Sequence, residues 1–226
     1  MKIDQLEQRK IIADAAVALY MSDRNRFTIR NIANDAQTTT RTCYKYYTSK
    51  DEILRDYYNL IPDSFRHQIG EIPDYQELLL ADRISNFIYS VFDMLQEQRS
   101  YVDETFNRFI QSDHSTTFRN SIANVIREIL ENDPRVSDLN RVVIPDFAYD
   151  VATSQFISLL RFWMTDKSEG TGNTLAFVEK FTVFVQEVMY SDVVGKGLDL
   201  GRYTISHIIP NHPWIKKIEQ HKCFKK

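Results

Sequence analysis

The sequence predicts an all-α protein, in which an N-terminal three-helix unit with a helix-turn-helix is followed by a larger helical bundle. Apolar residues recur at intervals of three and four along most of the chain, which is the spacing of helices that bury one face. Glycine and proline are scarce, at six each among 226 residues, and no segment alternates polar and apolar residues as a half-buried strand does. Hydrophobic residues make up 43% of the chain, which is enough to bury a core.

The N-terminal unit is expected to contain three helices, of which the last two are short. The first covers about residues 8–21 and ends at a polar run. Thr28 has the hydroxyl group of a helix N-cap and would begin the second helix, over about residues 29–36. We expect a turn at 37–39 and the third helix over about residues 40–46.

A fourth helix is expected to connect this unit to the body. Ser49 would cap it, Asp51 and Glu52 lie in its first turn, and it would extend over about residues 51–69. Beyond it the apolar pattern predicts longer helices, and the glycines and prolines after residue 195 predict an irregular, basic tail. The helices expected in the body cover about residues 74–98, 101–111, 116–131, 146–165 and 174–190.

The two short helices of the N-terminal unit have an apolar inner face and a basic, hydroxyl-rich outer face. Ile32 and Cys43 belong to the inner face. Arginine can read a guanine edge with two hydrogen bonds, whereas Thr, Tyr and Lys suit phosphates. Two short helices with a tight turn also allow the second to enter a major groove. The pattern therefore predicts binding to double-stranded DNA, the alternative being an ordinary solvated face. The outer face of the third helix presents Thr40, Arg41, Tyr44 and Lys45.

The net charge of −3 conceals an uneven distribution. Residues 1–60 carry ten Lys and Arg against eight Asp and Glu, residues 61–195 carry eleven against 21, and residues 196–226 carry seven against two. Between residues 24 and 50 there are six basic residues and one acidic residue, Asp35. Because affinity for phosphate depends on the local field, the basic head is compatible with DNA binding.

Other functional classes have little support. No stretch reaches the roughly 18 apolar residues of a membrane span, and the N-terminus is too polar for a signal peptide, so we expect a cytoplasmic protein without a membrane partner. Cys43 is expected to be a buried, inert thiol, the alternative being a redox sensor. His207, His212, His221 and Cys223 match no zinc module, so we expect a solvated tail and neither a metal nor a cofactor. The chain has no phosphate loop, nucleophile elbow or metalloprotease motif, which argues against an enzyme.

Two segments resemble the TetR family of bacterial transcriptional regulators. The first reads TIRNIANDA at 28–36 and TCYKYYTSKDEIL at 42–54, similar to the family's Thr, its Ile-Ala pair, its aromatic pair and its Ser-Lys-x-x-Leu. Residues 12–20 are similar to the family's first helix, and residues 156–164 to a helix near its C-terminus. The resemblance implies a homodimer that binds operator DNA, with an inducer site in the body. It divides the chain into a DNA-binding domain (1–50), a ligand-binding and dimerisation domain (51–195) and a tail (196–226).

The same resemblance assigns roles to residues of the head. Phosphate contacts are implied for Thr28, Thr40, Tyr44 and Lys50, and base contacts for Arg30, Arg41 and Lys45. At the turn, this chain has Gln37 where the family has glycine, which costs about 1 kcal/mol at a left-handed position. Operator preference is therefore expected to differ from that of relatives. The predicted DNA-binding residues are Thr28, Arg30, Thr39, Thr40, Arg41, Thr42, Tyr44, Lys45 and Lys50.

Two helices near the C-terminal end, 146–165 and 174–190, are apolar nearly all round. Pairing with the same helices of a second copy would bury both sides and give a four-helix interface, whereas a fully internal helix pair is the alternative. The predicted interface residues are Phe156, Leu160, Trp163, Phe177, Phe181, Phe184 and Val188. Aromatic residues of the body also suit either a cavity for a small apolar or aromatic ligand or an ordinary core. The predicted pocket residues are Phe87, Phe106, Phe109, Phe118 and Gln155.

The leading prediction is a repressor that a small molecule releases from its operator. The alternative is a regulator of the same fold that activates transcription or responds to a protein partner, without a small-molecule pocket. A body with a cavity of drug-like size would favour the former.

Overall fold

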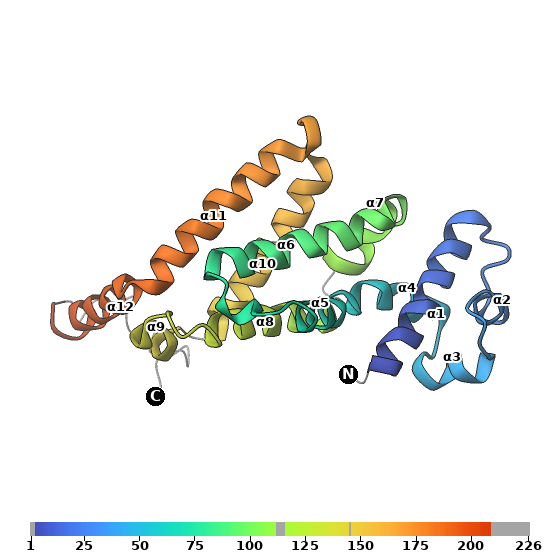
Figure 1. Ribbon diagram of the computed structural model, residues 1–226, viewed down its shortest axis with the longest axis horizontal. Coiled ribbons are helices and arrows are strands. Elements are labelled where there is room, and N and C mark those ends of the chain that lie inside the picture. The colour runs from blue at the N-terminus through green and yellow to red at the C-terminus, as the bar shows by residue number, and fades with distance from the viewer. Residues whose placement is uncertain (1–2, 112–115, 145, 209–226) are drawn as a thin grey trace.

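The computed structural model describes residues 3–111, 116–144 and 146–208, and among these residues it contains helices and no strand. The molecule is elongated, with α1–α3 forming a head at one end and α12 lying at the other (Figure 1). The predicted all-α architecture is confirmed. The helices are α1 (Ile3–Ser22), α2 (Ile29–Asp35), α3 (Thr40–Tyr46), α4 (Lys50–Asn59), α5 (Ile61–Gly70), α6 (Leu80–Glu97), α7 (Arg99–Phe106), α8 (Thr116–Glu131), α9 (Asp138–Val143), α10 (Asp146–Thr165), α11 (Gly172–Tyr190) and α12 (Val193–Tyr203), with short 3₁₀ segments η1 (Tyr75–Glu77) and η3 (Glu169–Thr171) and π-helical segments η2 (Asn107–Gln111) and η4 (Thr204–Ile208).

Hydroxyl groups cap the helices of the head. The Thr28 hydroxyl accepts a hydrogen bond from the amide of Asn31 at 3.3 Å, and the Thr39 hydroxyl accepts one from Thr42 at 3.1 Å. Ser49 caps α4 in the same way. Each cap satisfies an amide that the helix itself cannot pair, which explains why α2, α3 and α4 begin at these positions.

The turn between α2 and α3 contains a left-handed residue. Gln37 has φ of +50°, and its amide donates to the carbonyl of Asn34. The next amide, of Thr38, donates to the carbonyl of Ala33 at 2.8 Å. These two bonds form a Schellman motif, in which glycine is the usual left-handed residue. The predicted left-handed Gln37 is therefore present.

The connector differs from the single helix expected over 51–69. Helix α4 ends at Asn59, and α5 begins at Ile61 with Pro62 in its first turn. Proline lacks an amide proton and its ring clashes with the preceding turn, so it starts a helix more easily than it continues one. The helix expected over 74–98 is likewise shorter, because η1 precedes α6 and Leu78 is extended between them.

In the body, α11 packs mainly on α6 and α10 packs mainly on α8. Helices α10 and α11 therefore diverge from their connection and pack against different helices of the bundle (Figure 1). All described buried apolar residues except Ala81 and Tyr149 form one cluster, from Ile12 in α1 to Met189 in α11. Within the described ranges, no helix is both long and apolar enough to cross a membrane.

The chain after residue 195 is not the irregular tail that its glycines suggested. Helix α12 runs through Gly195, Gly197 and Gly201 and packs on α9 and α11. The amide of Gly195 also donates to the Asn140 side chain at 3.2 Å. Glycine costs about 1 kcal/mol in a helix interior, and packing of this kind can offset it. The rest of the expected tail, from residue 209, lies outside the described residues.

Candidate functional site

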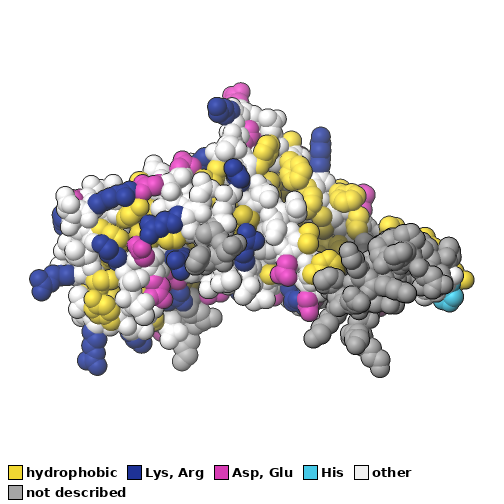
Figure 2. Space-filling view, turned by 180° about the vertical axis from the view of Figure 1, so that it is seen from behind, with side chains coloured by type: hydrophobic (Ala, Val, Ile, Leu, Met, Phe, Trp, Pro, Cys, Tyr) yellow, Lys and Arg dark blue, Asp and Glu magenta, His cyan; other side chains and the backbone are white. Residues whose placement is uncertain are grey.

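The outer face of the helix-turn-helix is open to solvent. Of the nine predicted DNA-binding residues, Thr42 is half-buried and the other eight are exposed. Tyr44 projects from the middle of α3 with 61% of its surface exposed. Lys and Arg side chains project from several parts of the head, with Asp and Glu side chains between them, on the face shown in Figure 2. The structure thus brings the predicted basic and hydroxylated residues onto one accessible unit.

Buried contacts fix α3 to the rest of the head. Cys43 is fully buried, and burial raises the pKa of its thiol, which agrees with the expectation of an inert thiol. The Tyr47 hydroxyl donates to Asp56 at 2.6 Å, and Arg9 Nε donates to the same carboxylate at 3.0 Å. Burial, together with the Asp56 charge, raises the pKa of Tyr47, so its hydroxyl remains a donor. Helix α3 is therefore fixed to α1 and α4 by buried contacts.

The ammonium group of Lys50 lies at the junction of α4 and the loop before α2. Its Nζ donates to the carbonyl of Phe27 at 3.2 Å and lies 4.9 Å from the centre of the Phe27 ring. These contacts stabilise the loop that leads to Thr28. Lys50 is nevertheless exposed, so its charge remains available at the surface of the head.

The head is bonded to the body through α7 and α4. The Tyr20 hydroxyl donates to Glu104 at 2.7 Å, and Arg24 pairs with the same carboxylate. These two donors lower the pKa of Glu104, which therefore stays ionised. Tyr101 on α7 donates to the carbonyl of Leu54 on α4 at 2.7 Å. These bonds join the head to the helix that leads into η2, in addition to the packing of α1 on α4.

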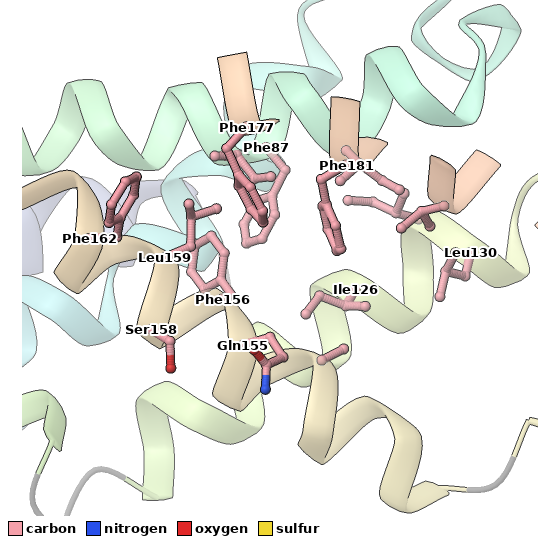
Figure 3. Close-up of a pocket in the computed structure, with 15 residues that line it drawn as sticks. Phe87, Ile126, Leu130, Gln155, Phe156, Ser158, Leu159, Phe162, Phe177 and Phe181 are labelled. Atoms are coloured by element: carbon pink, nitrogen blue, oxygen red, sulfur yellow. The ribbon is translucent and has the colours of Figure 1, made fainter. Parts of the chain in front are cut away.

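The body contains an apolar hollow between α10 and α11, which we call the trough. Its volume is about 470 Å³, and its floor is formed by residues of α6 and α8. In Figure 3, Phe177 and Phe181 of α11 extend towards Phe156 and Leu159 of α10. None of the lining side chains is charged, and Gln155 and Ser158 are the polar ones. The lining residues are Ile84, Phe87, Ile88, Ile126, Ile129, Leu130, Ala152, Gln155, Phe156, Ser158, Leu159, Phe162, Phe177, Phe181 and Val185.

The predicted pocket residues divide into two groups. Phe87 and Gln155 line the trough. Phe106, Phe109 and Phe118 do not line it, and all three are core residues with at most 2% exposure. Phe109 and Phe118 both pack against the ring of Tyr58. These three residues therefore belong to the core and not to the trough.

The predicted interface residues also divide. Phe177, Phe181 and Phe184 are exposed on α11 by 50%, 37% and 62%, and Val188 is half-buried. Leu160 and Trp163 are buried inside the chain, where Trp163 stacks on Phe92 at 4.9 Å. Leu160 and Trp163 therefore cannot contact a second chain as predicted. Phe156 is also buried and faces the trough, so the prediction fails for it too.

Some residues of these surfaces were not predicted from the sequence. Phe147, Val151 and Phe162 on α10 are large apolar side chains with 46% to 61% exposure. Their spacing along α10 is helical, so the pattern alone does not distinguish them from core residues. Among the described residues, no cluster of His, Cys, Asp or Glu is arranged to hold a metal ion. Three of the four residues weighed as metal ligands, His212, His221 and Cys223, lie outside the described residues.

Comparisons with known proteins agree with this geometry. Residues 83–203, more than half of the chain, match the family described as "Tetracyclin repressor-like, C-terminal domain". The fold is similar to that of a TetR transcriptional regulator from Nitrosomonas europaea, with a TM-score of 0.56 and 20% identity over 78% of this chain and 96% of that one. A fatty acid degradation regulator, FadR, from Bacillus halodurans gives a TM-score of 0.47 with 15% identity, covering 77% of this chain and 94% of that one. No curated protein matches the sequence significantly.

Proposed function

Because the chain belongs to the TetR family of transcriptional regulators, we propose that it is a repressor that a small apolar ligand releases from operator DNA. As a family member it is a transcriptional regulator rather than an enzyme, and the family implies operator binding and dimerisation. The further steps of the proposal concern which residues contact DNA, what the ligand is and how the two are connected. The main observation in support of DNA binding is the exposed basic face of α3.

We assign DNA reading to α3 and its caps. Arg41 and Tyr44 are exposed on one side of α3, while Cys43 anchors the opposite side in the core. Arg41 has the geometry to read a guanine in the major groove. Tyr44, Lys45 and Lys50 would contact phosphates, which position the helix without selecting a sequence.

The ligand response is assigned to the trough. Its volume of about 470 Å³ lies within the roughly 300–1,000 Å³ of small-molecule sites. Without a charged lining residue, it suits a neutral ligand that gains affinity from apolar burial. A cavity of this size favours control by a small molecule over the alternative of control by a protein partner alone.

DNA binding can be tested by selecting genomic fragments with the purified protein and measuring their affinity by fluorescence anisotropy. Affinity is expected to fall steeply with salt, because bound phosphates release counterions. Tyr44→Ala should weaken binding to all fragments alike, whereas Arg41→Ala should cost about 1–3 kcal/mol on the selected site and less on unrelated DNA.

Lys167→Ala provides a matched control, since it removes an exposed Lys from the α10–α11 connection, which is not part of the head (Figure 1). Its affinity for operator should equal that of the unmodified protein. If no fragment is selected at any salt concentration, the proposed function is wrong.

A further inference from the structure

We propose that the trough is a ligand site shared between two chains, open in a single chain and closed by a second copy. This inference rests on the proposed function, which assigns a neutral apolar ligand to the trough. It adds that ligand binding and dimerisation are coupled, so that each strengthens the other.

The first observation is that the trough lacks one wall. Its floor is buried, with Phe87 and Ile88 of α6 at 2% and 3% exposure. Its rim is exposed, with Phe162 of α10 and Phe177 of α11 at 46% and 50%. A ligand bound to the floor would therefore leave its outer side in water, because no described residue of the same chain covers the rim.

The second observation is that the rim continues into an uncovered apolar surface. Phe177, Phe181, Phe184 and Val188 are spaced by four, three and four residues, so they form one stripe along α11. Phe177 and Phe181 also line the trough, so stripe and cavity share residues. Apolar side chains gather over this part of the molecule in Figure 2. A partner that covers the stripe must also cover the rim.

A second copy of the chain is the occupant that fits this surface. Membership of the family implies dimerisation, and α10 adds three exposed large apolar residues, Phe147, Val151 and Phe162, to those of the stripe on α11. A two-fold contact would place the same stripe of each chain against the other. A helix with its side chains is about 10–12 Å across, so a partner helix would rest on the rim rather than fill the trough.

The coupling has a measurable size. If the closed site exists only in the dimer, each of two sites tightens dimerisation by a factor of one plus the ratio of ligand concentration to its dissociation constant. At a ligand concentration ten times that constant, the dimer dissociation constant should therefore fall by about a hundredfold.

The test uses the full chain and the neutral fluorescent probe N-phenyl-1-naphthylamine, whose rings match the uncharged lining. Sedimentation with and without the probe gives the dimer dissociation constant, and a dilution series gives probe affinity above and below it. Phe184→Asp places a charge on the stripe without altering a lining residue, since Phe184 does not line the trough. Leu175→Asp makes the same chemical change on the opposite side of α11, where the residue is 41% exposed.

We expect the probe to tighten the dimer, Phe184→Asp to be monomeric and to lose at least tenfold in probe affinity, and Leu175→Asp to behave as the unmodified protein. Circular dichroism checks that both variants fold, and the dilution series gives the same answer without a variant. Equal probe affinity in monomer and dimer would overturn the shared site and leave the proposed ligand response intact. Weaker probe binding to the dimer than to the monomer would also overturn the shared site, because the partner would then fill the trough. A Phe184→Asp variant that remains dimeric would overturn it as well, because the stripe would then not be the interface. If the probe binds neither form, the ligand part of the proposed function fails as well, while operator affinity, measured separately, still tests DNA binding.

Discussion

Asp133 is a fully buried carboxylate held by three partners. Arg135 Nε lies 2.9 Å from one of its oxygens, and the Tyr190 hydroxyl donates to the other at 2.8 Å. The guanidinium of Arg83 on α6, also fully buried, pairs with it as well. Burial alone would raise the pKa of Asp133, but the hydrogen bonds from Arg135 and Tyr190 and the charge of Arg83 lower it to about 2. The ionised group thus ties α6 to the end of α11.

We expect Asp133→Asn to lower the free energy of unfolding by about 3–5 kcal/mol at neutral pH, because it leaves Arg83 buried without a counter-charge. The carboxyl group has a pKa of about 2 in the folded chain and 3.8 ordinarily, so its contribution is complete above pH 4 and is lost as pH falls towards 2. The difference in urea-unfolding free energy between the two proteins should therefore shrink by about 2 kcal/mol over that interval.

Asp146→Asn is the matched control, because 90% of the Asp146 side chain is exposed. It should change stability little at any pH. If the difference in unfolding free energy between Asp133→Asn and the unmodified protein stays constant down to pH 2, the Asp133 carboxyl does not have the lowered pKa given above.

At the scale of the elements, the α2–α3 turn carries a measurable strain. A left-handed φ destabilises a residue that has a Cβ atom by about 1–2 kcal/mol. Glycine removes this cost, but its greater conformational freedom in the unfolded chain cancels part of the gain. Gln37→Gly is therefore expected to raise the free energy of unfolding by about 0.5–1 kcal/mol. Thermal or urea unfolding measures it. Gln37→Ala retains the Cβ atom and should give no gain, so equal effects of glycine and alanine would show that the turn is not strained.

The helix boundaries show which elements a sequence can predict. The expected ranges of α3, α8 and α10 coincide with the observed ones, because an apolar stripe or a hydroxyl cap marks their limits. Helices α9 and α12 were not expected. The Asn140 side chain on α9 donates to the carbonyls of Val188, Met189 and Ser191, and such contacts between distant segments have no local signature in the sequence.

The candidate site follows the same division. Exposure of α3 and burial of Cys43 could be predicted, because one helix face determines both. The trough could not, since aromatic residues at helical spacing line a cavity and fill a core equally well. Phe118 packs on Tyr58 while Phe87 faces the trough, and only the packing of α6, α8, α10 and α11 distinguishes them.

At the scale of the whole molecule, Glu104 connects the head to the body. It accepts bonds from Tyr20 and Arg24, and neither of these residues lies on α3. We therefore expect Glu104→Ala to change the affinity of the ligand-free protein for operator by less than about fivefold, which is the lower end of the range for coupling between sites. The factor by which a trough ligand reduces operator affinity should fall several-fold, because the bonds from Tyr20 and Arg24 to α7 are lost.

Asp103→Ala is the control for this prediction. Asp103 is the neighbouring carboxylate on α7 and pairs with Arg99 within the body, not with the head. Anisotropy titrations with and without ligand measure the coupling in both variants. If both lose it equally, a general weakening of α7 rather than the bond to the head is responsible.

The continuous core and the bonds from α7 to the head also bear on modularity. Tyr20 and Arg24 lie in the head, Leu54 lies on the connector, and their partners Glu104 and Tyr101 lie in the body. A hybrid regulator that joins this body to the head of a relative would keep Glu104 on α7 but would lose its hydrogen-bond donors Tyr20 and Arg24. Such a chimera should be designed with its junction after α4, and with residues 20 and 24 of the incoming head changed to Tyr and Arg. Without these changes, we expect the hybrid to combine the DNA preference of one parent with the ligand preference of the other, but with a weaker coupling between the two sites.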